Sequence, residues 1–157
     1  MDISVRYARR NELEEVNRLR KQVNEVHVNG RPDIFKAGFC QQLRDHVYDN
    51  FDSGDSDIIV ALAGGTVCGF AAVRYVKRSE TPFSYERSYY MIEEFGVDEN
   101  YRRKGVAAGL IGFCKEEARA KGYKRMELDY WAFNEAAEKF YEQAGFKVYR
   151  KYTELFL

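Results

Sequence analysis

The spacing of apolar positions changes along the chain, and each change predicts a new element. Ile3 to Tyr7 alternates between apolar and polar residues, as a short strand does. Apolar residues then recur at helical spacing. They predict one helix capped by Asn11, with Glu14 completing a capping box, and a second helix from about Phe35 to Phe51. Arg31-Pro32-Asp33 separates the two helices, because the residue before a proline avoids helical geometry.

The middle of the chain changes to the alternation of β-strands. Ile58 to Ala63 and Thr66 to Val76 flank the dipeptide Gly64-Gly65, which is typical of a two-residue hairpin turn. A polar loop from Lys77 to Arg87 then leads to a third apolar strand, from Tyr89 to Val97. We therefore expect three consecutive antiparallel strands in this region.

Helices and strands alternate in the last third of the chain. We expect an amphipathic helix from Gly105 to about residue 122, a strand from Arg125 to Trp131, and a short helix from Asn134 to Ala144. Phe146 to Leu157 is expected to return as a last, bulged strand. The helix between strands 89–97 and 125–131 predicts a parallel pair with a right-handed crossover.

The predicted order is β-α-α-β-β-β-α-β-α-β, which gives an α/β fold of the mixed-sheet (α+β) type with helices on both faces. A chain of 157 residues is long enough for one such domain and short for two, so we assign residues 1–157 to a single domain. Hydrophobic residues make up 45% and charged residues 32% of the chain, which places it among ordinary soluble globular proteins.

Charge and apolar runs argue against several classes of protein. The formal net charge is zero, which disfavours nucleic-acid binding through overall charge. No apolar run reaches the length of a membrane span, and the N-terminus lacks a signal-peptide core, so we expect a cytoplasmic protein with no membrane partner. Cys40, Cys68 and Cys114 lack the spacing of metal ligands, and their apolar neighbours favour buried free thiols.

The stretch from Val97 to Leu110 has the layout of an anion site. A strand leads into a polar turn, and the cations Arg102, Arg103 and Lys104 follow. Gly105 then opens a helix whose first N–H groups have no acceptor in the helix. Turn chemistry alone also places a glycine there, and a basic triplet is usually a solvated face. The spacing fits neither Gly-x-x-x-x-Gly-Lys-Ser/Thr nor Gly-x-Gly-x-x-Gly.

A second motif runs from Asn134 to Phe146. Asn134 and Tyr141 are seven residues apart, about two helical turns, so they lie on one face of the predicted helix. That face can present an amide and a phenol to one site. The alternative is an asparagine that caps the helix and a tyrosine that packs against the sheet.

Together the two motifs resemble the GNAT (GCN5-related N-acetyltransferase) superfamily of bacterial type. Arg102-Arg103-Lys104-Gly105-Val106-Ala107 resembles its Arg/Gln-x-x-Gly-x-Gly/Ala signature, placed after a strand that ends in valine. The pattern Asn-x-x-Ala-x-x-Phe-Tyr-x-x-x-Gly-Phe from Asn134 to Phe146 resembles its C-terminal signature. The resemblance implies the GNAT acyl-CoA N-acyltransferase fold over essentially the full length, acetyl-CoA as acyl donor, and no metal.

The resemblance also implies a role for each matching residue. The pyrophosphate of acetyl-CoA would lie on the backbone N–H groups of Arg102, Arg103, Lys104, Gly105, Val106 and Ala107. The pantetheine arm would pair with the backbone at Val97 and Asp98 and hydrogen-bond to Asn134. The Val97 N–H would donate to the thioester carbonyl. Tyr141 would protonate the departing thiolate, since a phenol of pKa about 10 can serve a thiol of pKa near 8.5.

The acceptor needs a base, because an amine of pKa about 10.4 is almost fully protonated at neutral pH. Glu93 and Glu94 lie just before Val97, where the family often places a carboxylate. Their opposite parity lets only one face the cleft, although a bulge near Gly96 would reverse the choice. We favour Glu94, and a base that acts through a water molecule is equally compatible.

The segment from His27 to Phe35 resembles a His-x-x-x-Arg-Pro-Asp-x-Phe segment of some bacterial GNAT proteins. His27 is therefore a candidate substrate contact, or else a helix-end histidine that interacts with the helix dipole. Phe35 and Trp131 are candidates for the lining of the acceptor cleft, and both also suit a core.

These observations favour an N-acetyltransferase that moves acetyl from acetyl-CoA to a primary amine by direct attack in a ternary complex. The acidic pair and the aromatic residues favour a small cationic amine or a peptide amine as acceptor. The alternative is a non-catalytic acyl-CoA-binding or regulatory module of the same fold. A nucleic-acid binder that uses Arg102 to Lys104 is disfavoured by the zero net charge. Exposed edge strands leave room for a homodimer.

Overall fold

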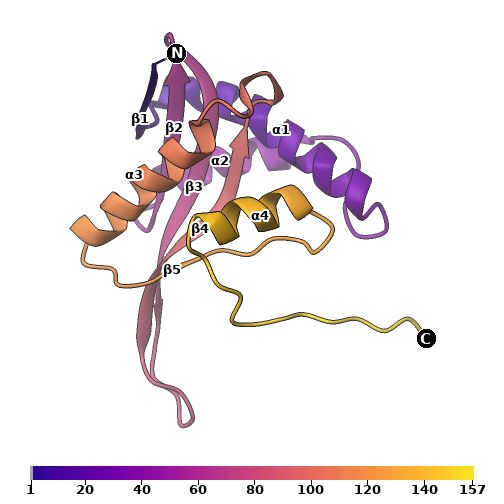
Figure 1. Cartoon of the computed structure of the whole chain (residues 1–157), viewed down its shortest axis with the longest axis vertical. Helices are drawn as coiled ribbons and strands as arrows, with labels where there is room; N and C mark the ends of the chain where they lie inside the picture. Colours follow the sequence, from indigo (N-terminus) through magenta and orange to yellow (C-terminus); the bar gives the residue numbers. More distant parts are fainter. Residues whose placement is uncertain (1) are drawn as a thin grey trace.

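A computed structural model describes residues 2–157 and shows one five-stranded sheet with helices on both faces (Figure 1). The strands are β1 (Ile3–Tyr7), β2 (Ser56–Ala63), β3 (Thr66–Arg78), β4 (Arg87–Val97) and β5 (Met126–Glu127), and they lie in this order across the sheet. The first four are antiparallel to their neighbours, whereas β5 is parallel to β4. The mixed sheet and its parallel crossover are therefore confirmed.

Two helices cover each face of the sheet. The helices are α1 (Leu13–Gly30), α2 (Gln41–Asp52), α3 (Val106–Ala120) and α4 (Glu135–Gln143), and two short 3-10 turns, η1 (Arg10–Glu12) and η2 (Glu99–Tyr101), precede α1 and α3. Alternate residues of β2 enter separate cores: Ile58 and Val60 share one with residues of α1 and α2, whereas Ile59 shares the other with residues of α3 and α4. Because both faces are covered, β2 is almost continuously apolar.

The start of each of the first two helices differs from the prediction. Asn11 does not cap α1, because it lies inside η1. The capping box is formed two residues earlier, where the Arg9 N–H donates to the Glu12 carboxylate at 2.8 Å. The second helix begins at Gln41 rather than near Phe35. Gly38, with φ of +88°, lies in the irregular segment that delays it.

The pairing of β3 with β4 contains a bulge at Glu93. Ala72 pairs with Glu94 and Val73 pairs with Ile92, so Glu93 has no partner across the ladder. A bulge near Gly96 would reverse the choice between Glu93 and Glu94; the observed bulge lies three residues earlier. A bulge shifts the alternation of side chains by one, which decides where the two glutamates point.

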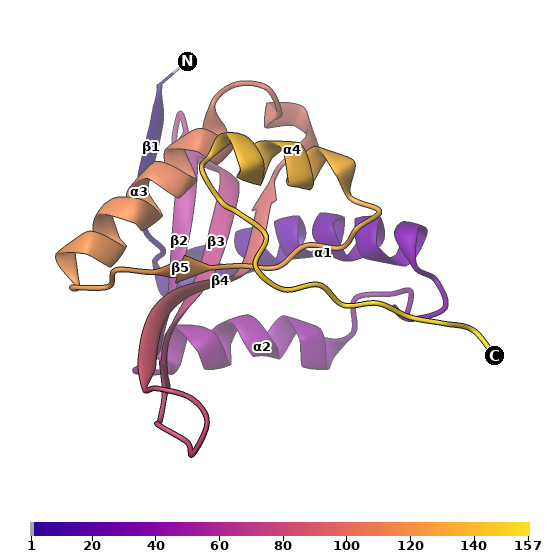
Figure 2. The same ribbon diagram turned by 60° about the horizontal axis from the view of Figure 1, so that its bottom comes forward.

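The C-terminal part of the chain departs most from the predicted strands. Only Met126–Glu127 of the expected strand 125–131 pairs with β4. Residues 146–157 are extended but form no strand, so the expected last strand of the sheet is wrong. Figure 2 shows this segment leaving α4, passing β5 and running away from the domain to the C-terminus.

Three further expectations concern membranes, thiols and metals. Within residues 2–157, no helix is long and apolar enough to cross a membrane, and no group of three or more His, Cys, Asp or Glu side chains is arranged to hold a metal ion. Cys68 and Cys114 are buried free thiols, as expected, but Cys40 is exposed at the start of α2.

Candidate active site

One edge of the C-terminal half of β4 has no paired strand. β4 and β5 pair only at Tyr90 with Met126 and at Met91 with Glu127, after which the chain of β5 leaves the ladder. The Asp98 N–H donates to the Cys68 carbonyl of β3 at 2.9 Å. Because N–H groups alternate in direction along an antiparallel strand, the Val97 N–H points to the opposite, open side. The fold thus leaves an unpaired donor at Val97.

Asp98 anchors the turn that follows. Its side chain is 4% exposed and accepts hydrogen bonds from Arg18 at 2.6 Å and from the Asn100 N–H at 3.0 Å. Burial opposes its ionisation, but these hydrogen bonds outweigh burial and hold the pKa of Asp98 below its usual value. Its carbonyl accepts from the Tyr101 N–H at 2.8 Å. Both main-chain groups of Asp98 therefore already have a partner in the chain, and its carbonyl oxygen keeps one further lone pair for a ligand.

The turn into α3 exposes unpaired N–H groups. Gly105, the N-cap, has φ of +82° and provides no side-chain cap, and Arg103 has φ of +61°, which is uncommon for a residue with a side chain. The first hydrogen bond of the helix runs from the Gly109 N–H to the Gly105 carbonyl at 3.0 Å. The N–H groups of Val106, Ala107 and Ala108 have no acceptor among residues 2–157.

The cations of this turn point into solvent. Arg102, Arg103 and Lys104 are exposed, and none of them forms an ion pair with a residue that the structure describes. A Cβ atom built on Gly105 would meet nothing within 4 Å. The turn therefore combines open space, free N–H groups and positive charge, which is the chemistry of an anion site.

Tyr141 and Asn134 lie on α4, as the motif requires. The Tyr141 ring is 8% exposed and packs against Phe95, at 6.1 Å between ring centroids, on the open half of β4. Burial and the charge of Asp129 raise the pKa of Tyr141 to about 12. Its hydroxyl makes no hydrogen bond to the described part of the chain. The side-chain Oδ1 of Asn134 caps α4 by accepting from the Ala137 N–H at 3.1 Å. The side-chain NH₂ group of Asn134 is left for a ligand.

The bulge turns Glu93 and Glu94 to the same face of the sheet. Glu93 pairs with Arg74 of β3 at 2.6 Å. Glu94 accepts two hydrogen bonds from Arg20 of α1, at 2.9 and 3.1 Å. The expectation that opposite parity separates the two side chains is therefore wrong, since the bulge changes the alternation between them. Each of the two carboxylates is therefore paired with an arginine.

The structure brings His27, Phe35 and Trp131 together. The ring of Phe35 lies 5.0 Å from that of His27 and 5.0 Å from that of Trp131, and Phe133 completes the cluster at 6.3 Å from Trp131. His27 is in the last turn of α1, so its interaction with the helix dipole also stands. Burial lowers the pKa of His27, although the charges of Glu94 and Asp129 act in the opposite direction.

Sequence reasoning did not find Asp129. It is exposed, and its carboxylate makes no ion pair or hydrogen bond with any residue of the described range. Its charge nevertheless raises the pKa of both His27 and Tyr141, so Asp129 lies near both side chains. In the sequence it is one acidic residue in a short strand, and only the departure of this strand from β4 brings it to the cleft.

Known proteins resemble this chain in sequence over a short segment. A curated relative, the uncharacterised N-acetyltransferase YycN of Bacillus subtilis, is 39% identical over 56 residues. This match covers 36% of each chain, so the chain spans about a third of that relative's length.

Solved structures resemble it over nearly its whole length. The F44R mutant of the BH1408 protein from Bacillus halodurans has a TM-score of 0.94 at 26% identity and covers 98% of this chain and 99% of its own. The aligned 98% of this chain therefore includes most of residues 146–157. AAC(6')-Iy, in complex with a bisubstrate analogue of CoA and acetylneamine, has a TM-score of 0.78 and covers 100% of this chain and 99% of its own. Its 19% identity shows the shared fold alone.

The family assignment rests on a match that includes all parts of the candidate site. The model of the acetyltransferase (GNAT) family matches residues 23–146, from the second half of α1 to the end of the Tyr141 motif. This range contains the open half of β4, the anion site of α3 and the aromatic cluster. The chain therefore belongs to the acetyltransferase (GNAT) family.

Proposed function

We propose that this acetyltransferase moves acetyl from acetyl-CoA to a primary amine by direct attack in a ternary complex. One arrangement carries the proposal: the unpaired Val97 N–H, the free N-terminus of α3 and the Tyr141 ring, which packs on Phe95, all lie at the unpaired half of β4 or directly after it. A thioester donor needs an anion site, an oxyanion donor and an acid for the leaving thiolate, and this opening supplies all three.

The donor would bind along the open half of β4. The N–H groups of Val106, Ala107 and Ala108 would hold the pyrophosphate, with help from the cations of residues 102–104 and the backbone of Gly105. The pantetheine arm would follow β4 as an added strand and take a hydrogen bond from the Asn134 NH₂ group. Asp98 would act indirectly, by fixing the turn between the two halves of this site.

The chemistry would take place at Val97 and Tyr141. The thioester carbonyl would accept a hydrogen bond from the Val97 N–H, which stabilises the oxyanion as the amine nitrogen attacks the acetyl carbon. The C–N bond forms, the C–S bond breaks, and the sulfur takes the proton of the Tyr141 hydroxyl. With a pKa of about 12, this phenol is fully protonated at neutral pH and is available as a donor.

The mechanism also needs a base that takes the proton of the attacking amine. Both oxygens of Glu94 already accept a hydrogen bond from Arg20, and we propose that Glu94 takes the amine proton through a water molecule. Asp129 has no partner within residues 2–157, and we propose it as the second carboxylate that attracts and deprotonates the amine. Glu93 is held by Arg74, and we propose a structural role for it. Comparison of Glu94→Gln with Asp129→Asn distinguishes the two bases.

The acceptor would be a small cation or a peptide amine. Asp129 carries a negative charge that no residue of the described range pairs with. The rings of His27, Phe35 and Trp131 provide faces for an alkylammonium group. The structural neighbour AAC(6')-Iy is an aminoglycoside N-acetyltransferase by name, which is consistent with an amine acceptor.

The direct test is release of CoA thiol from acetyl-CoA with a panel of polyamines, aminoglycosides and lysine peptides. We expect release with at least one cationic amine and none without acceptor. Calorimetric titration with acetyl-CoA should show binding with or without acceptor. Tight binding with no thiol release from any amine would instead favour a non-catalytic acyl-CoA-binding module.

A further inference from the structure

α1 holds the open half of β4 on both sides of Val97. Three residues before Val97, Glu94 accepts two hydrogen bonds from Arg20 of α1, at 2.9 and 3.1 Å. One residue after Val97, the buried carboxylate of Asp98 accepts a hydrogen bond from Arg18 of α1 at 2.6 Å. The backbone that carries the Val97 N–H therefore lies between two ion pairs to the same helix.

Gly96 lets α1 lie directly against this segment. A Cβ atom on Gly96 would lie 2.7 Å from Cγ2 of Val23 of α1 and 2.9 Å from Cε1 of Phe70 of β3. Val23 is β-branched and has little freedom to move aside, so this close approach requires a glycine. Because alternate residues of a strand share a face, positions 94, 96 and 98 all face α1.

The same helix is tied to β3 and to the turn after β4. The Arg18 guanidinium donates a second hydrogen bond, at 3.1 Å, to the Val67 carbonyl of β3. Gln22 of α1 accepts from the Glu99 N–H at 3.1 Å. Arg18 and Gln22 lie four residues apart and so share one face of the helix. That face therefore fixes the end of β4 against β3 and fixes the start of the following turn.

The open half of β4 needs this support because, within residues 2–157, it has a paired strand on one edge alone. An oxyanion donor stabilises the transition state best if its direction is fixed before the reaction, and a displacement of about 1 Å can lower the rate by roughly 10²-fold. The start of α3 is fixed separately, since Val106 is 1% exposed and packs on Gly69 of β3. Loss of an α1 contact should therefore affect Val97 more than the anion site.

We propose that α1 supports the open half of β4 in place of a neighbouring strand, and that Arg18 is a positioning residue for the Val97 N–H. Arg18 acts through Asp98 and the Val67 carbonyl, which hold the end of β4 against β3. The effect on turnover rests on the proposed function, in which this N–H donates to the thioester carbonyl. Arg18 can be replaced with less damage to the fold than Arg20, since its side chain is 40% exposed and that of Arg20 is 4% exposed.

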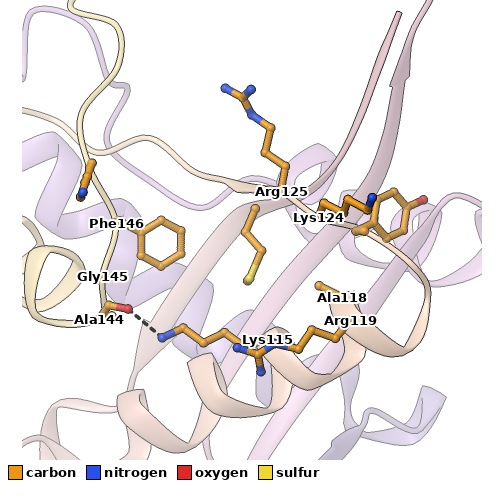
Figure 3. A pocket seen from close by; sticks show the side chains of 11 residues that line it. Lys115, Ala118, Arg119, Lys124, Arg125, Ala144, Gly145 and Phe146 are labelled. Atoms are coloured by element: carbon orange, nitrogen blue, oxygen red, sulfur yellow. Dashed lines mark hydrogen bonds between the residues drawn. The ribbon is translucent and has the colours of Figure 1, made fainter.

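The first experiment measures the order of the Val97 amide by ¹⁵N relaxation in the protein without ligand. We expect an order parameter of about 0.85 in the wild type, the value of rigid backbone, and below about 0.7 in Arg18→Met. Arg18→Lys keeps a cation beside Asp98 and should stay within about 0.1 of the wild type. Arg119→Met is the matched control and should cause no change, because Arg119 is exposed on α3 and lines a pocket of about 400 Å³ on the side of β5 (Figure 3).

The second experiment compares turnover with donor binding. For an amine that the wild type acetylates, kcat should fall by roughly tenfold in Arg18→Met, whereas the Kd for CoA should change by less than about threefold. Arg18→Lys should keep kcat within about threefold of the wild type, since it keeps the charge beside Asp98. The double variant Arg18→Met/Asp98→Asn should be no slower than the slower of its two single variants, because both act through one ion pair.

The two measurements separate this proposal from the proposed function. If the wild type acetylates no amine, the proposed function fails, and the order parameter still decides whether α1 supports β4. An unchanged order parameter at Val97 in Arg18→Met would overturn the role of Arg18. An increase in Kd as large as the decrease in kcat would also overturn it, since the effect would then lie at the anion site. An equal loss of order in Arg119→Met would do the same, because it would indicate a general loosening of the fold.

Discussion

Arg20 and Glu94 form a two-point ion pair between α1 and β4, from Nε to one carboxylate oxygen at 2.9 Å and from Nη2 to the other at 3.1 Å. Arg20 is 5% exposed and also donates to the Asn17 side chain at 2.9 Å and to the Leu43 carbonyl at 2.5 Å. One guanidinium thus joins α1, the start of α2 and the edge of the cleft. Any role of Glu94 in catalysis depends on this arginine.

Removal of the Arg20 guanidinium should destabilise the fold. Arg20→Met keeps much of the side-chain volume but leaves Glu94 and the Leu43 carbonyl without their donor. We expect a loss of about 3 kcal/mol in the free energy of unfolding, the range for a broken buried pair. Urea denaturation measures it. Arg78→Met, at the exposed end of β3, should change stability by less than about 0.5 kcal/mol. A loss of similar size in both variants would contradict the role of the ion pair.

Loss of the Tyr141 hydroxyl should lower turnover more than binding. Tyr141→Phe keeps the aromatic packing with Phe95 but removes the proton donor, so we expect kcat to fall by roughly 10²-fold. The Kd for acetyl-CoA should change by less than about threefold, because the hydroxyl is used in the transition state. Thiol release and calorimetry measure the two effects. Tyr85→Phe, at an 87% exposed site, is the control, and equal activity in both variants would refute the acid role.

The Gly105 turn should be sensitive to any side chain. Gly105→Ala forces a residue with Cβ into φ of +82°, which costs about 1–2 kcal/mol in stability. We also expect weaker binding of CoA, because relaxation of the turn moves the free N–H groups of α3. Gly112→Ala is the opposite control: it lies inside α3 with open space around it and should stabilise by about 0.5–1 kcal/mol. Thermal unfolding and calorimetry with CoA measure both.

The pH dependence of stability should contain a contribution from His27. Burial lowers the pKa of His27 in the folded state below the unfolded value of about 6.5. The unfolded chain therefore binds the proton more readily, and the contribution is lost as pH falls from above about 6.5 towards the lower folded pKa. His27→Gln should flatten the rise in unfolding free energy between about pH 5 and 7, measured by urea titration. A rise that remains as steep as in the wild type would exclude His27 as its source.

The element order was predictable because it depends on local patterns. The hairpin at Gly64-Gly65, the amphipathic α3 and the cap of α4 at Asn134 follow from backbone chemistry and periodicity within about fifteen residues. The predicted capping box was two residues too late, because Glu12 rather than Glu14 completes it. Two acidic residues at similar spacing offer the same local signal, and the packing of the helix chooses between them.

Other features depend on contacts between distant segments. The bulge at Glu93 arises from how β4 matches β3, and it turns both glutamates towards arginines of different elements. Asp129 becomes a cleft residue only because its strand leaves β4 after two paired residues. Periodicity describes which face a residue would take in a regular strand, and it has no information about where pairing stops.

The sequence by itself determined the type and order of the elements as far as α4, the two motifs and the candidate residues for binding a thioester donor. Only the tertiary structure decided that both main-chain groups of Asp98 have partners, that Arg20 holds Glu94, and that residues 146–157 form no strand with any part of residues 2–157. Local propensity depends on neighbours along the chain, so it can be predicted from the sequence. Hydrogen-bond partners and open edges depend on which segments meet after folding, and these are properties of the whole fold.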